Sequence, residues 1–355
     1  MNRVKFGDVV QEIKINVDRS TDDHEYFIAG EHMDSSNIHI TRRGRFSESD
    51  VGPAFTRLFR PGQVLYGSRR TYLRKVAVAD FEGITSNTTF VLETKDSNRL
   101  LQELLPYIML TDRFSEYAIN NSKGSTNPYI LFKDLAAYEF DLPTIEEQRQ
   151  LVVLLSACDR AKEAYKRLLK QTDEVVKSQF IEMFGNPILH EKDDSLSRLG
   201  DICLLKAGKF VKADDIKETQ ADGMYPCYGG NGLRGYVPDY NQEGDCPLIG
   251  RQGALCGNVQ YATGRFHATE HAVVVTPKIE MNRYWLYHLL VMLELNRYAS
   301  GAAQPGLAVN KLEDIRISVP HIADQNLFSA LAEQSDKSKF VVKKNLKTIS
   351  LIYQR

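Results

Sequence analysis

Apolar residues in the middle of the chain recur at helical spacing over a long stretch. Residues 144–184 contain neither glycine nor proline, which favours one uninterrupted helix. Thr144 followed by Glu147 is typical of a capped helix start, and Gly185 is typical of a helix end. At 1.5 Å per residue, such a helix is roughly 60 Å long. Because this exceeds an ordinary globular helix several-fold, a helix buried in a single domain core is the less favoured alternative.

A second stretch without glycine or proline covers 321–355, and both stretches carry an apolar stripe. The spacing of the stripe is close to the 3.5-residue period of paired helices. Two such helices in one chain are most simply paired with each other in antiparallel fashion. The predicted seam consists of Leu151, Leu155, Tyr165, Leu169 and Val176 in the first helix, and of Phe328, Leu331, Val342, Leu346 and Ile349 in the second.

Short apolar runs separated by turns precede each helix. In the first part of the chain, VLYGSRRTYLRKVAVAD predicts two strands around a turn, TTFVLET a third strand, and LLQELLPYIML a helix. These runs predict a compact mixed α/β domain over 1–143.

The same order of features returns after the first long helix, over 185–320. A constant shift of 177 positions pairs Gly124 with Gly301, Pro128 with Pro305, Leu135 with Leu312, Pro143 with Pro320, and Gln148 with Gln325. Slightly larger shifts pair Tyr117 with Tyr298 and Gly67 with Gly250. An internal repeat of this kind indicates two copies of one structural unit. The predicted fold is therefore α+β, with two pseudo-repeated α/β domains separated by two long antiparallel coiled-coil helices.

Antiparallel helices would place the two domains at opposite ends, related by a pseudo-two-fold axis. A ligand that is itself long and nearly two-fold fits this arrangement. Duplex DNA is such a ligand, because its major grooves recur every ~34 to 36 Å on one face. Since the two domains differ in sequence, we expect a bipartite, asymmetric target with an unread gap that is set by helix length.

The overall composition adds little to this prediction, but the local charge supports DNA as the ligand. The net charge is −1, 43% of residues are hydrophobic, and the five cysteines form no CxxC pair, so neither a disulfide framework nor a zinc ribbon is expected. Without an apolar run long enough for a membrane span or a secretory leader, we expect no membrane contact and a cytoplasmic location. Residues 41–75, however, hold nine Arg and Lys against Glu48 and Asp50.

Side chains that reach base edges or phosphates are Arg, Lys, Asn, Gln and small hydroxyls. In the first domain the candidate DNA-binding residues are Arg42, Arg43, Arg45, Arg69, Arg70, Arg74, Lys75, Lys123, Ser125, Asn127 and Tyr129. In the second domain they are Lys209, Lys212, Tyr228, Asn231, Arg234, Arg251, Gln252 and Gln304.

The sequence resembles the specificity (S) subunit of type I restriction–modification systems. The likeness rests on DLPTIEEQRQLVVLLSACDRA paired with SVPHIADQNLFSALAEQSDKS, and on GSRRTYLRK paired with GRQGALCGN. It implies a target recognition domain in 1–143, a central conserved helix in 144–184, a second recognition domain in 185–320 and a distal conserved helix in 321–355. It also implies a non-catalytic protein without cofactor or metal. Its partners would be double-stranded DNA, two modification (methyltransferase) subunits docked on the helices, and a restriction subunit that joins through them.

Two catalytic hypotheses compete with this interpretation. Asp80, Glu93 and Lys95 could hold Mg²⁺ in a nuclease, but the second copy lacks the carboxylates. Asn127-Pro128-Tyr129 is similar to the amino-methyltransferase motif that stacks a flipped base, yet it lacks the second proline. A protein-only adaptor is a third hypothesis, which the basic segment argues against.

Two binding motifs are also weak. Gly250, Gly253 and Gly257 lack the GK[ST] ending of a phosphate loop. His267 and His271 have the spacing of helical zinc ligands, but they lie in a β-rich context without a third ligand nearby.

Overall fold

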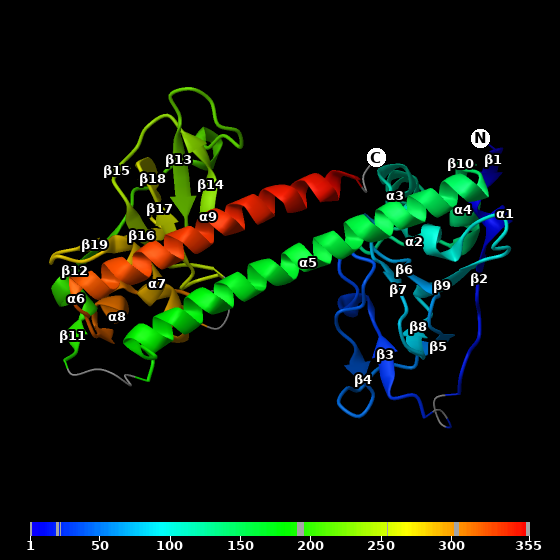
Figure 1. Ribbon diagram of the computed structural model, residues 1–355, viewed down its shortest axis with the longest axis horizontal. Helices are drawn as coiled ribbons and strands as arrows, with labels where there is room; N and C mark the ends of the chain where they lie inside the picture. Colours follow the sequence, from blue (N-terminus) through cyan, green and yellow to red (C-terminus); the bar gives the residue numbers. More distant parts are fainter. Residues whose placement is uncertain are drawn as a thin grey trace. The chain divides into compact units, whose positions relative to one another are not determined.

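The computed structural model describes residues 2–18, 21, 23–189, 195–253, 255–301 and 305–352. The chain divides into two compact units. Unit 1 comprises Met1–Lys166 and Lys343–Arg355, and unit 2 comprises Arg167–Val342. Each unit holds one mixed α/β domain together with parts of two long helices, and we describe each unit by itself (Figure 1).

Unit 1 contains two four-stranded sheets. The first has the order β2-β9-β6-β7, with β2 at Val10–Glu12, β9 at Thr89–Thr94, β6 at Val64–Gly67 and β7 at Val76–Val78. The second has the order β4-β3-β8-β5, with β4 at Gly44–Arg45, β3 at Tyr26–Ile28, β8 at Gly83–Ser86 and β5 at Phe55–Phe59. A further antiparallel pair joins β1 (Asn2–Lys5) to β10 (Glu139–Leu142).

Short helices complete the first domain. They are α1 (Phe6–Val9), α2 (Leu105–Leu110), α3 (Asp112–Asn120), α4 (Phe132–Ala136) and the 3₁₀ turns η1 (Gly30–His32), η2 (Thr71–Leu73) and η3 (Gln102–Leu104). Pro106 lies in the first turn of α2, where its missing N–H costs nothing. The Thr111 hydroxyl caps α3 by accepting from the Phe114 N–H. The predicted helix LLQELLPYIML is thus divided between η3 and α2.

Unit 2 repeats this plan. One sheet has the order β12-β19-β16-β17, with β12 at Cys203–Ala207, β19 at Ala272–Pro277, β16 at Cys246–Gly250 and β17 at Val259–Ala262. The other has the order β14-β13-β18-β15, with β14 at Gly232–Val237, β13 at Tyr225–Gly229, β18 at Arg265–Ala268 and β15 at Gln242–Glu243. The small pair is β11 (Ser197–Arg198) with β20 (Arg316–Ile317).

The helices of the second domain are α6 (Leu199–Ile202), α7 (Arg283–Met292), α8 (Val309–Glu313) and the turns η4 (Ala213–Asp215) and η5 (Leu295–Tyr298). Strand for strand, the two domains share one sheet order, including a parallel pair, β3 with β8 and β13 with β18. The predicted internal repeat is therefore confirmed at the level of topology, as is the α+β fold class.

The long helix α5 spans Ile145–Phe184, as the sequence predicts. Its start is capped reciprocally, because Thr144 N–H donates to the Glu147 carboxylate at 2.8 Å and Glu147 N–H donates to the Thr144 hydroxyl at 3.4 Å. At its end Gly185 has φ +80°, a left-handed conformation that glycine adopts without strain.

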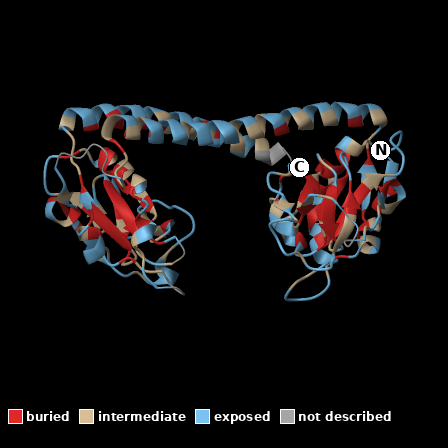
Figure 2. Cartoon of the chain, turned by 90° about the horizontal axis from the view of Figure 1, so that it is seen from below, coloured by how far each residue is buried: buried red, intermediate tan, exposed pale blue. Residues whose placement is uncertain are grey.

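The second long helix, α9, spans Ile322–Ile352 and runs antiparallel to α5. In unit 2 the rings of Phe180 and Phe328 lie 5.2 Å apart, and Lys339 donates to Asp173 at 2.7 Å. As the residue number falls along α5, the number of its partner in α9 rises, which defines the antiparallel direction. Figures 1 and 2 both show this part of α9 beside the second half of α5.

The predicted seam residues have different surroundings. Val176, Phe328 and Val342 are buried, whereas Leu331 is 44% exposed. Tyr165, Leu169, Leu346 and Ile349 are half-buried. Leu155 packs against the core of the first domain, and together with Leu151 it lines a groove of about 530 Å³ beside α2. The first turns of α5 therefore bury part of the stripe against their own domain.

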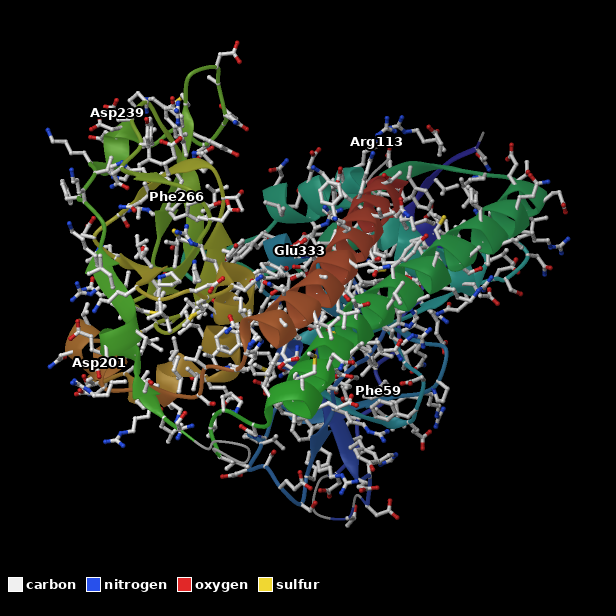
Figure 3. The ribbon with its side chains drawn as sticks, turned by 60° about the vertical axis from the view of Figure 1, so that its left-hand side comes forward. Phe59, Arg113, Asp201, Asp239, Phe266 and Glu333 are labelled. Atoms are coloured by element: carbon white, nitrogen blue, oxygen red, sulfur yellow. The ribbon has the colours of Figure 1, made fainter. Side chains whose placement is uncertain are left out.

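The core of each unit lies between its sheets and its helices. In unit 2 the fully buried Trp285 of α7 stacks on Phe180 of α5, and Phe328 of α9 completes the cluster. Phe266, labelled in Figure 3, is fully buried in the second sheet. Figure 2 shows buried residues concentrated in the sheets, with exposed residues along most of the long helices.

Candidate nucleic-acid interface

Two loops of the first domain meet on its surface, and we call them together loop pair 1: residues 68–75, after β6, and 121–131, between α3 and α4. Backbone bridges join Arg69 to Tyr129 and Lys123 to Tyr129. Arg70 N–H also donates to the Pro128 carbonyl at 2.6 Å. Since Tyr129 is the shared centre of both bridges, the backbone fixes the basic turn against the polar loop ahead of the long helix.

Loop pair 1 also stores backbone strain. Arg70 and Arg74, on either side of η2, have φ values of +52° and +49°. The left-handed region is costly for residues other than glycine, and such outliers gather at functional sites. Tyr72, in η2 between these two residues, is 53% exposed. Tyr72 is a residue that sequence reasoning missed.

The predicted residues of loop pair 1 divide into accessible and engaged groups. Arg69, Ser125 and Tyr129 are exposed, and Arg70 donates to the half-buried Asn127 amide oxygen at 3.3 Å. The other cations have partners inside the domain. Arg74 pairs with Asp112 at 2.8 Å, Lys123 pairs with Asp134 at 2.8 Å, and Lys75 donates to the Gly30 carbonyl. An engaged cation must give up these partners before it can contact a phosphate.

The upstream basic cluster, Arg42, Arg43 and Arg45, is divided in the structure. Arg42 pairs with Asp34 at 2.7 Å, Arg43 stacks over Tyr26 and Phe81, and Arg45 faces Glu25 and Glu48. Phe81 lies just before β8, whereas loop pair 1 contacts the segment just after β8, where Ser68 N–H donates to the Thr88 carbonyl at 3.0 Å. The structure therefore places Arg43 and Arg45 apart from loop pair 1, whereas Arg42 pairs with Asp34, next to Ser35, which forms a backbone bridge to Lys75 of that loop pair.

The second domain builds the same loop pair, and we call residues 251–253, 255–257, 299–301 and 305–307 loop pair 2. Backbone bridges join Gln252 to Gly306 and Ser300 to Gly306. Leu307 N–H donates to the Arg251 carbonyl at 2.9 Å. Gly306 thus takes the place of Tyr129, so the two surfaces share a backbone plan but differ in side chains.

Other loops of the second domain approach loop pair 2. Gly230, in the β13–β14 turn, lies so close that a Cβ on Gly250 would meet its carbonyl oxygen at 1.9 Å. Only glycine permits this approach, and it brings Asn231 to the same surface. Lys209 N–H donates to the Ala268 carbonyl at 2.9 Å, which places the 208–212 loop at the end of β18.

The predicted residues of the second domain are mostly accessible. Lys209, Lys212, Asn231, Arg234 and Gln252 are exposed, Arg251 and Tyr228 are half-buried, and Gln304 lies outside the described residues. Tyr228 packs edge-on against Phe266, and burial raises the pKa of its phenol. Phe210, between Lys209 and Lys212, is 70% exposed. Sequence reasoning missed it, although an aromatic residue between two lysines is a usable signal for nucleic-acid contact.

Two of the three residues of the nuclease hypothesis have contacts within the domain. Lys95 donates to the Gly7 carbonyl at 2.5 Å, and Glu93 accepts from the Gln63 amide at 2.8 Å. The ring nitrogens of His267 face the Asp239 and Lys209 carbonyls. Within the described ranges, no group of three or more His, Cys, Asp or Glu is arranged to hold a metal, and no helix is long and apolar enough to cross a membrane.

Two copies of one α/β domain, each with the same backbone-bridged pair of loops and each followed by a long helix, define a two-module protein. Residues 20–172 and 191–348 both match the type I restriction modification DNA specificity domain. These matches cover most of the chain, and it belongs to that family.

Curated relatives agree with this assignment. The type I restriction enzyme EcoprrI specificity subunit of Escherichia coli is 44% identical over 158 residues, which are 43% of this chain and 39% of that protein. The chain thus spans about two fifths of that relative's length. The MjaIX specificity subunit of Methanocaldococcus jannaschii is 26% identical over 319 residues, 80% of this chain and 73% of the relative.

The fold resembles the type I restriction–modification S subunit from M. genitalium, with a TM-score of 0.65 at 17% identity over 99% of this chain and 93% of that one. A chain from a structural study of type I R-M complex assembly and conformational transition gives a TM-score of 0.53 at 18% identity, over 99% and 94%. At these identities the likeness concerns the fold alone.

Proposed function

We propose that this protein is the non-catalytic DNA-specificity subunit of a type I restriction–modification complex. In this proposal residues 1–143 and 185–320 are target recognition domains, and each reads one half of a bipartite, asymmetric DNA site. The helices over 144–184 and 321–355 set the gap between the halves and dock two methyltransferase subunits, through which a restriction subunit joins.

The observation that carries the proposal is the repetition of the loop pair. Lys123, Arg69 and Tyr129 form in the first domain the same bridged arrangement as Ser300, Gln252 and Gly306 in the second. A shared loop backbone lets both domains approach DNA in the same way, and different side chains let each domain recognise a different base sequence. Exposed Tyr72 and Phe210 add apolar surface beside the cations, and such surface contacts base edges and thymine methyl groups.

The test uses the full chain assembled with its methyltransferase subunits and a DNA library randomised in both half-sites. Arg69 is exposed. Arg69→Ala should relax discrimination in one half-site by ~1 to 3 kcal/mol and leave the other unchanged. Arg60 pairs with Glu82, next to β8. Arg60→Ala is the matched control and should leave discrimination unchanged in both half-sites.

Two outcomes would refute the proposal. If Arg69→Ala relaxed both halves together, one domain would not read one half. If binding of the wild-type complex hardly changed between low and high salt, contacts from Lys and Arg to phosphates would not hold the DNA. Incubating the pure chain with Mg²⁺ and DNA separates this function from the nuclease hypothesis, because the specificity subunit should cut nothing.

A further inference from the structure

A short segment of the first domain contacts both loop pair 1 and the long helix α5. We call residues 35–39 the connecting segment. Ser35 forms an antiparallel backbone bridge to Lys75, and Ser36 N–H donates to the Arg74 carbonyl at 3.1 Å. The segment is therefore attached through its backbone to the end of the basic turn in loop pair 1.

The connecting segment is also attached to α5 by two side chains of the helix. The Lys162 ammonium donates to the Ser36 carbonyl at 3.1 Å, and the buried Asp159 carboxylate accepts from the His39 imidazole. Asp159 and Lys162 are three positions apart, so they lie on the same side of the helix. Ser36 thus donates to loop pair 1 and accepts from the long helix, through its own N–H and carbonyl.

Backbone strain gathers at the same contacts. Among the described residues, four that are not glycine have a positive φ, and three of them are Ser36, Arg70 and Arg74, at +53°, +52° and +49°. The hydrogen bond between their backbones joins Ser36 directly to Arg74. Such conformations persist only where the surrounding contacts hold them, and they are frequent at functional sites. The turn that exposes Tyr72 therefore depends on its supporting contacts for its shape.

We propose that Lys162 and Asp159 are positioning residues for DNA recognition, because through the connecting segment they hold the turn of residues 70–74 in its base-reading shape. The inference rests on the proposed function, and it adds that discrimination in the first half-site depends on two residues of the long helix that need not touch DNA. Without the Lys162 contact, the strained turn can relax. Its exposed side chains then no longer have one fixed direction.

The second domain uses the equivalent helix positions differently. The shift of 177 positions places Lys339 where the first domain has Lys162. Lys339 pairs with Asp173 of α5 at 2.7 Å and with Asp336 of α9 at 2.5 Å. Asp336 in turn accepts from the Tyr284 hydroxyl of α7. These contacts join helices to one another rather than a helix to a recognition loop, so we expect the dependence in the first half-site only.

The experiment measures binding of the full chain, assembled with its methyltransferase subunits, to a DNA library randomised in both half-sites. Lys162→Met removes the donor, and it should lower discrimination roughly two- to thirtyfold in the half-site that Arg69→Ala relaxes. Discrimination in the other half-site should stay unchanged. Lys162→Arg keeps a cationic donor and should restore most of the discrimination. Lys166 pairs with Glu163 within α5, so Lys166→Met removes an equal charge and should change neither half-site.

A second pair of variants tests the connecting segment without changing the helix. Ser36→Gly keeps the backbone N–H and carbonyl and adopts a positive φ without strain, so discrimination should be retained. Ser36→Pro removes the N–H and fixes φ at about −65°, so it should relax the same half-site as Lys162→Met. Because Ser36 is exposed, neither change disturbs the core of the domain.

The results separate this inference from the proposed function. Unchanged discrimination in Lys162→Met and Ser36→Pro, with the first half-site still relaxed by Arg69→Ala, would overturn the positioning role and leave the proposed function standing. Equal relaxation of both half-sites in Lys162→Met, without recovery in Lys162→Arg, would also overturn that role, because a general loss of stability would explain it. If Arg69→Ala changed discrimination in neither half-site, the proposed function would fail as well.

Discussion

At the scale of single residues, buried polar side chains fix each domain to its long helix. Gln148, in the first turn of α5, donates to the Pro143 and Arg99 carbonyls and accepts from the Leu101 N–H at 2.9 Å. Gln325 of α9 repeats this by donating to the Pro320 carbonyl and accepting from the Asn282 N–H. Each glutamine is nearly fully buried, so it fixes the helix direction where the domain ends.

A second polar contact of unit 1 should respond to pH. His39 donates from Nε2 to the buried carboxylate of Asp159 on α5, and this hydrogen bond raises the pKa of the imidazole. Because the folded pKa exceeds the unfolded value of about 6.5, the contact stabilises the fold fully below that value. The stabilisation is lost as pH rises through the folded pKa.

We therefore expect His39→Gln to lower the melting temperature more at pH 6 than at pH 9. The side chain of His39 is about half exposed, so solvent screening keeps the difference small. Asp159→Asn removes the partner and should flatten the same pH response. Thermal unfolding measures these melting temperatures. If His39→Gln lowered the melting temperature equally at both pH values, the charged pair would not have the proposed role.

At the scale of elements, aromatic packing holds the end of α5 against the second domain. Phe180 contacts Phe184, Trp285 and Phe328, with ring centroids 5.0 to 6.4 Å apart. These rings come from α5, α7 and α9, so one cluster joins both long helices to the domain. Burial of large rings is the strongest stabilising contribution that this junction contains.

Phe180→Ala should destabilise unit 2 by ~3 to 5 kcal/mol, because it opens a cavity among side chains that cannot collapse into it. Val175→Ala, at a position 62% exposed on the same helix, should change stability by less than about 0.5 kcal/mol. Denaturant unfolding followed by tryptophan fluorescence measures both, since Trp285 lies in the cluster. A loss below about 1 kcal/mol for Phe180→Ala would show that this junction is not tightly packed.

At the scale of the whole molecule, the proposed function predicts that the length of the two long helices sets the gap between the DNA half-sites. Seven residues inserted after Arg167 in α5 and seven after Val342 in α9 preserve the apolar phase and add ~10 Å of helix. That length corresponds to roughly three base pairs. The preferred gap should lengthen by this amount while both half-sites stay the same, as sequencing of methylated sites would show.

The control is an insertion in α5 alone, which shifts the register between the two helices. We expect that variant to lose stability and activity together. If the paired insertions left the gap unchanged, the helices would not set the spacing of the half-sites.

The sequence by itself determined the two long helices, the repeat and the fold class. These follow from local and periodic signals: the capping residues Thr144 and Glu147, the left-handed Gly185, and a constant shift between matching residues. Only the three-dimensional fold decided which of the candidate residues are accessible. Arg74 pairs with Asp112, 38 positions away, and Lys123 with Asp134, and no short-range pattern reports such pairings.

The same reason explains the residues that were missed. Tyr72 and Phe210 are apolar positions that a sequence pattern would place in a core, and only the folded loops leave them exposed. Periodicity shows which face of an element is apolar, because apolar residues recur at every turn of a helix and at every second residue of a strand. A loop surface repeats nothing along the chain, so the tertiary contacts that assemble it determine which of its polar groups are free to bind.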